Sequence, residues 1–100
     1  MMSVVGEFIC KHQLQTDIKT RYVDLASEIG ELGKEILKST EYGKKDFSTN
    51  PQVIDEVGDC LFSLFVLCHE LGIDAHDVLS GALKKYEKRF ANLGDIGSGR

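Results

Sequence analysis

The sequence predicts an all-α fold of four helices in a single domain. Only one proline, Pro51, occurs among the 100 residues. No segment alternates apolar and polar residues with a period of two, and apolar residues recur instead at the spacing of a helix face. A lone chain of this length buries about 60–68% of its unfolded surface, so oligomerisation would add to a modest core.

Two helices are expected in the first half of the chain. A short one covers about residues 3–14, and a longer one runs from about 17 to 42, with Gly43 as its stop signal. The apolar stripe of the longer helix follows the i, i+4, i+7, i+11 spacing of one face, and we expect it to face the core. This stripe consists of Leu25, Ile29, Leu32 and Ile36.

Two further helices are expected in the second half. Asn50 followed by Pro51 is a good N-cap and first-turn pair for a helix that ends near Gly72. Asp74 then caps a fourth helix that reaches about residue 92. Residues 94–100 have the composition of a flexible tail, so the domain is assigned to 1–93. The expected buried side of the fourth helix is Val78, Leu79, Ala82, Leu83, Tyr86 and Phe90.

The third helix indicates how the bundle is completed. Between Cys60 and Cys68 every residue except Ser63 is apolar, so this helix has no polar face there. A helix that is hydrophobic all round must be enclosed on all sides. Three companions of this length could hardly enclose it, so we expect a four-helix bundle completed by dimerisation. The alternative is a compact monomeric four-helix bundle.

Composition narrows the class of protein and its compartment. A net charge of −4 argues against binding to a nucleic-acid backbone. The three cysteines include no CxxC pair, and reduced thiols in a cytoplasmic protein are the simplest interpretation. We see no signal peptide, and the longest apolar run falls far short of the ~20 residues that cross a membrane.

Two pairs of acids stand out: Glu28 with Glu31, and Glu56 with Asp59. Each pair is spaced i, i+3, so both carboxylates share one helix face beside apolar positions. Crowded carboxylates at the rim of a core repel one another and lose hydration. A hard divalent cation would compensate, and an all-carboxylate set without Glu-x-x-His or Cys/His ligands suits magnesium or manganese. The alternative is a set of ordinary solvated glutamates.

The fourth helix carries the opposite charge. Lys85 and Arg89 are spaced i, i+4, so they share a face and could grip one polyanion. The alternative is a basic last turn that complements the helix dipole.

These motifs together resemble the EExxE…ExxD signature of the MazG-like nucleoside triphosphate pyrophosphohydrolases, over about residues 20–92. The segments that carry the resemblance are Ser27-Glu28-Ile29-Gly30-Glu31-Leu32, Asp55-Glu56-Val57-Gly58-Asp59-Cys60-Leu61-Phe62, Leu71-Gly72-Ile73-Asp74 and Lys85-Tyr86-Glu87-Lys88-Arg89-Phe90.

The resemblance implies an all-α MazG-like bundle that forms a homodimer or homotetramer. It also implies magnesium-dependent hydrolysis of nucleoside triphosphates to a monophosphate and pyrophosphate, typical of nucleotide-pool house-cleaning. In this interpretation Glu31 or Glu35 orients or deprotonates the attacking water, and Lys85 and Arg89 bind phosphate. The implied metal ligands are Glu28, Glu31, Glu56 and Asp59.

Three positions depart from the family pattern. Ser27 stands where the family usually has a first glutamate, which leaves the number of metal ions open; Asp24 and Glu35 share the face of Glu28 and are possible substitutes. Leu83 replaces a common asparagine and Gln52 a common basic residue, for which Lys44 and Lys45 could compensate. Two alternative functions therefore stay open: a non-catalytic interaction module derived from this fold, and a phosphoribosyl-ATP pyrophosphohydrolase.

Overall fold

The computed structural model describes residues 2–93. They form four α-helices and no strand: α1 (Met2–Lys11), α2 (Ile18–Ser39), α3 (Pro51–Leu71) and α4 (Ala75–Leu93). The all-α prediction and the number of helices are therefore confirmed. The predicted flexible tail at 94–100 lies outside the described residues.

Local sequence signals set most helix ends where we expected them. The side chain of Asp17 accepts a hydrogen bond from the Thr20 amide at 2.7 Å, which caps α2. Asn50 likewise accepts from the Val53 amide at 3.0 Å, and Pro51 occupies the first turn of α3. Gly72 ends α3 in the left-handed conformation, with φ of 70°. The start of α2 and both ends of α3 are thus set by residues next to them in the sequence.

The end of α2 differs from the expected position. This helix stops at Ser39, and the Thr40 amide closes its last turn on carbonyls of the preceding turn. Glu41 and Tyr42 follow with positive φ values of 50° and 60°, so the chain has already left the helix before Gly43. The glycine therefore continues a turn that begins earlier and is not itself the stop signal.

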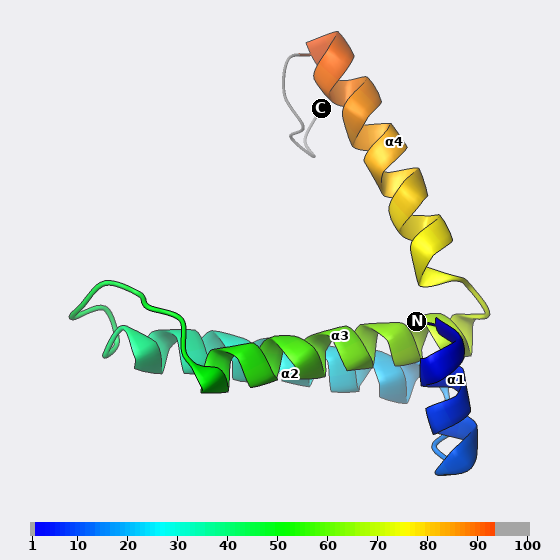
Figure 1. Ribbon diagram of the computed structural model, residues 1–100, viewed down its shortest axis with the longest axis horizontal. Helices are drawn as coiled ribbons and strands as arrows, with labels where there is room; N and C mark the ends of the chain where they lie inside the picture. Colours follow the sequence, from blue (N-terminus) through cyan, green and yellow to red (C-terminus); the bar gives the residue numbers. More distant parts are fainter. Residues whose placement is uncertain (1, 94–100) are drawn as a thin grey trace.

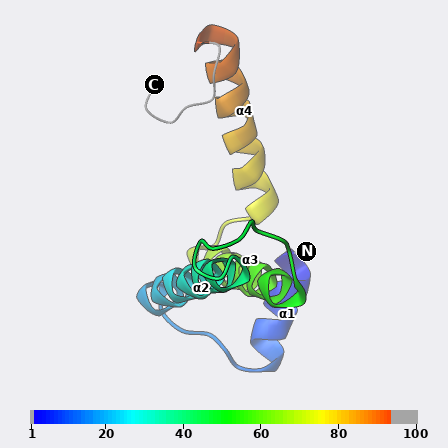
Figure 2. The ribbon, with the colours of Figure 1, turned by 90° about the vertical axis from the view of Figure 1, so that its left-hand side faces the viewer.

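α2 and α3 lie side by side and antiparallel, and they form the body of the chain (Figure 1). α1 crosses α3 near its C-terminal end, where Ile9 and Val66 are buried (Figure 2). α4 projects away from this body at a steep angle. The Cα radius of gyration is 16.7 Å, whereas a compact domain of 100 residues would have about 13 Å. The observed architecture is therefore not the compact monomeric bundle that we considered as an alternative.

The face of α2 that packs on α3 is not the predicted stripe. Leu25 and Leu32 are half-buried as expected, but Ile29 and Ile36 are 55% and 39% exposed. Packing against one helix covers a narrow seam with a repeat of seven residues, and here polar residues occupy part of it. The half-buried positions on this seam are Arg21, Leu25, Glu28, Leu32 and Glu35.

The predicted buried side of α4 is also largely uncovered. Val78, Leu79, Leu83 and Phe90 are between 47% and 59% exposed, and Ala82 and Tyr86 are half-buried. In the angle between α3 and α4 lies an apolar groove of about 480 Å³. Its lining residues are Leu61, Leu64, Phe65, Cys68, Ala75, Val78, Leu79 and Ala82.

Candidate metal centre

Three carboxylates from two helices meet on the α2–α3 pair. One carboxylate oxygen from each of Glu28, Glu56 and Asp59 lies within 4.8 Å of the others. Glu28 comes from the seam of α2, whereas Glu56 and Asp59 lie one turn apart on α3. Glu28 and Glu56 are half-buried, and Asp59 is exposed. The cluster is therefore open to solvent on the side of Asp59.

Glu56 is the electrostatically strained member of this cluster. Its Oε2 atom is buried and makes no hydrogen bond within residues 2–93. Desolvation raises the pKa of Glu56, and the negative charges of Asp59, Glu28 and Glu31 raise it further. A buried carboxylate oxygen without a donor costs free energy that a bound cation would recover.

The donor set fits a hard divalent cation. Every oxygen in the cluster is carboxylate oxygen, the type of ligand that magnesium and manganese prefer. The thiol of Cys60 lies on the next turn of α3, but burial and the charges of Glu28, Glu56 and Asp59 raise its pKa. The thiol is therefore held in its protonated form, which is a poor metal ligand.

The remaining predicted acids lie around this cluster. Glu31 is not among its three members, although its charge acts on the pKa of Glu56. Glu35 is bound to Lys38, with 3.1 Å between Oε2 and Nζ. Asp24 is bound to Arg21 at 3.5 Å. The structure thus brings together three of the four predicted metal ligands, and Glu31 is not one of these three.

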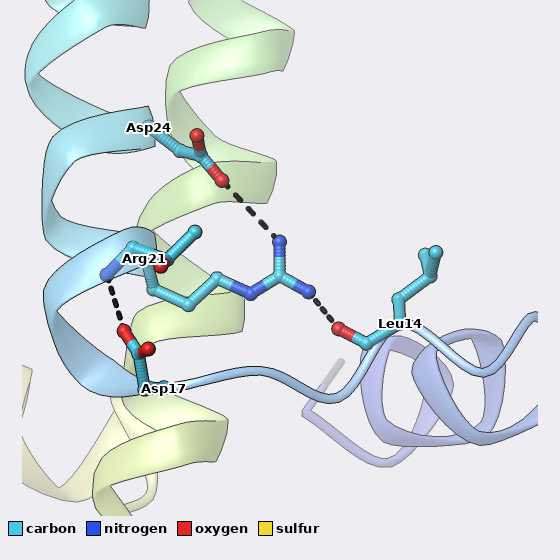
Figure 3. Close-up of polar contacts among 5 residues, drawn as sticks. Leu14, Asp17, Arg21 and Asp24 are labelled. Atoms are coloured by element: carbon cyan, nitrogen blue, oxygen red, sulfur yellow. Dashed lines mark hydrogen bonds and ion pairs between the residues drawn. The ribbon is translucent and has the colours of Figure 1, made fainter.

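Arg21 organises the entrance to α2, and our sequence interpretation missed it. Its guanidinium donates to the Leu14 carbonyl in the α1–α2 connection and to the Asp24 carboxylate (Figure 3). It occupies the seam position seven residues before Glu28, and only 15% of its side chain is exposed. A charged residue at a seam spacing was the signal that could have identified it.

The predicted phosphate-binding residues lie on α4. Lys85 and Arg89 both contact the Tyr86 ring, at 4.9 and 5.5 Å from its centroid, and line a shallow hollow of about 430 Å³ with Lys88 and Asn92. Because α4 projects away from the α2–α3 pair, the fold of one chain does not carry this basic surface to the carboxylates (Figure 1). Their role in phosphate binding stays a prediction.

Comparison with known families gives one result. The profile of the MazG nucleotide pyrophosphohydrolase domain matches residues 16–93, which include all three clustered carboxylates and the basic helix. The chain therefore belongs to the MazG family, as its motifs predicted. Neither the curated proteins nor the solved structures gave a significant match. No helix among the described residues is long and apolar enough to span a membrane.

Changing Glu56 to Gln should have opposite effects with and without metal. Without metal, the variant should melt higher than wild type, because a desolvated negative charge beside Asp59 and Glu28 is removed. With millimolar magnesium, wild type should gain melting temperature by mass action, at about 4–8 °C per kcal/mol of binding free energy, and the variant should gain little. Thermal unfolding followed by circular dichroism measures both effects.

Glu70→Gln is the matched control for this experiment. Glu70 also has a buried oxygen without a hydrogen bond and lies on α3, but it is outside the carboxylate cluster. Its variant should keep the full magnesium response. An unchanged melting temperature of wild type in magnesium or manganese would contradict a metal site here.

Proposed function

We propose that this chain hydrolyses (deoxy)nucleoside triphosphates to the monophosphate and pyrophosphate, with magnesium or manganese bound at the α2–α3 carboxylates. The observation that supports this proposal best is the meeting of Glu28, Glu56 and Asp59 within 4.8 Å, inside the region that matches the family. The substrate would be a free nucleotide and not nucleic acid, given the net charge of −4. A cytoplasmic location would suit a nucleotide-pool enzyme.

In this proposal each acid has a distinct task. Glu28, Glu56 and Asp59 hold the cation, and Glu31 completes the set at its edge. Bound magnesium supplies charge neutralisation for the phosphate oxygens and for the leaving pyrophosphate. Glu31 also orients the attacking water and accepts its proton; it is better suited to this than Glu35, whose carboxylate is engaged by Lys38.

We further propose that two copies assemble through α3 and α4. The exposed apolar residues of α4, the groove between α3 and α4, and the uncovered isoleucines of α2 leave more apolar surface in water than a monomer of this size tolerates. A second copy offers the same surfaces and would cover them with two-fold symmetry. Such a dimer, or a pair of dimers, would enclose the apolar part of α3.

This assembly would also bring basic side chains to the carboxylates. Lys85 and Arg89 are remote from the carboxylates of their own chain, because α4 projects away from the α2–α3 pair. When α4 docks on a second copy, its basic surface can reach that copy's carboxylates. Lys85 and Arg89 would then hold the triphosphate of the neighbouring site, the arginine in bidentate fashion.

The bond that is cleaved provides the central test. Wild-type protein incubated with magnesium and a panel of nucleoside triphosphates, including phosphoribosyl-ATP, should release monophosphate and pyrophosphate in equal amounts, measured by chromatography. Glu28→Gln should lower the rate by about a hundredfold or more, because it removes one cation ligand. Diphosphate and orthophosphate as products would contradict attack at the α-phosphorus, and no product at all would favour the interaction module.

Solution size tests the assembly. Multi-angle light scattering should report a dimer or tetramer of the chain at micromolar concentration. Leu83→Glu, which places a charge on the exposed apolar side of α4, should shift the protein towards the monomer, whereas Lys84→Glu, on the side of the helix away from these apolar residues, should not. A wild-type protein that stays monomeric at all concentrations would contradict the proposed assembly.

Mixing two inactive variants tests the shared site. Glu28→Gln and Arg89→Ala should each be slow alone, but in a hybrid dimer one site keeps its acids and receives an intact basic helix. Random mixing should therefore restore roughly a quarter of wild-type activity, because half of the dimers are hybrids with one good site each. Mixed protein with no more activity than its components would place both groups in the same chain.

A further inference from the structure

An aromatic cluster lies beside the carboxylates on α3. Phe62 follows Asp59 by three residues, so their Cβ atoms are about 5–6 Å apart on the helix surface. The Phe8 ring of α1 packs edge-on against Phe62, with centroids 5.7 Å apart and planes at 86°. The His12 ring lies against Phe8 at 4.5 Å and 47°. The three rings thus extend from the edge of the candidate metal centre onto α1.

The helical geometry places these rings on the open side of the centre. Each step of three residues turns the direction on α3 by about 60°, so Glu56, Asp59 and Phe62 lead progressively away from the α2 seam. α1 packs on this same side of α3, since Phe8 contacts Phe62 and Gly6 lies against His69, one heptad further along. The exposed side of the carboxylate cluster is therefore bordered by α2 on one flank and by α1 on the other.

The packing of α1 on α3 leaves a large part of these rings exposed. Ile9 of α1 is fully buried and Val66 of α3 is 1% exposed, so each of the two packed helices has a buried apolar residue. Phe8 and Phe62, by contrast, remain 46% and 39% exposed, and His12 is exposed as well. These exposed rings form an aromatic corner beside the candidate metal centre: because the Phe8 ring stands at 86° to Phe62 and at 47° to His12, a planar group can stack on one ring and meet the edge of the next.

We propose that Phe62, Phe8 and His12 bind the nucleobase of the substrate through stacked and edge-on aromatic contacts, so that α1 contributes to base selection. This inference rests on the proposed function, since it takes the triphosphate to lie on the carboxylates. With the triphosphate on the carboxylates, the base stays within one nucleotide's length of the cation. It would then lie over Phe62, and Phe8 and His12 would lie beyond it. Phe8 and His12 lie before the region that matches the family, whereas Phe62 lies within it.

Isothermal titration calorimetry with two probes, in the presence of magnesium, tests this role. One probe is a deoxynucleoside triphosphate with a methylene group between its α- and β-phosphorus, and the other is inorganic tripolyphosphate, which has no base. Wild type should bind the nucleotide more tightly. Phe62→Leu and Phe8→Leu should each weaken nucleotide binding about tenfold, as expected for one lost stacking contact, and leave tripolyphosphate binding unchanged.

Two variants make the comparison specific. Phe62→Tyr keeps the ring and should keep the affinity for nucleotide. Phe47→Leu removes a comparably exposed phenylalanine (48%) in the loop at the opposite end of the α2–α3 pair and should change neither probe. Equal nucleotide affinity in wild type and in both leucine variants would overturn the proposal.

A second readout uses wild-type protein and does not depend on how the variants fold. Stacking on the rings should shift the base protons of the bound nucleotide upfield in NMR spectra, and absence of this shift would overturn the proposal. Wild type that binds both probes equally also overturns the base site while leaving the pyrophosphohydrolase intact. Wild type that binds neither probe in magnesium removes the proposed function and this inference together.

Discussion

The fold depends on one seam, between α2 and α3, and this seam is only partly apolar. Leu25 and Leu32 supply apolar contacts from α2. The seam positions that alternate with them, also seven residues apart, are charged: Arg21, Glu28 and Glu35. Half-buried charges cost free energy unless they are paired. Arg21 and Glu35 are paired within the chain, whereas Glu28 faces two further acids. The unpaired position is thus where a cation would add most to stability.

Local signals in the sequence were sufficient to predict the four helices and most of their ends, though not the end of α2. Asp17, Asn50-Pro51 and Gly72 act on the backbone within a few residues of themselves, so their effects could be read without the fold. The apolar stripe of α2 was only half right, because it assumed a broad core. α3 is the one helix of the described chain that packs along α2, and it covers Leu25 and Leu32 but not Ile29 and Ile36. Whether a residue is buried depends on tertiary packing, which the periodicity of one helix does not determine.

The candidate site, like the fold, could be predicted from the sequence only in part. The i, i+3 spacing predicted that Glu56 and Asp59 share a face, and the family resemblance implied that Glu28 binds the same metal. The separation of Lys85 and Arg89 from these acids could not be predicted, since it follows from the direction of α4 after Gly72. The pairing of Arg21 with the Leu14 carbonyl depends likewise on the path of the α1–α2 connection. Sequence spacing determines neighbours on one helix, whereas contacts between helices require the fold.

Stability and function place opposite demands on so short a chain. A monomer could cover its apolar residues by folding α4 along α3, but α4 would then keep its basic residues on one molecule and close the apolar groove to others. With α4 extended, the chain leaves apolar surface uncovered and holds its acids and its basic residues apart. In the proposed dimer, the contact that covers the apolar surface would also bring the basic residues of one copy to the acids of the other. Burial of apolar surface between subunits, which needs no metal, would then be the force that positions the charged groups for a polyanionic substrate.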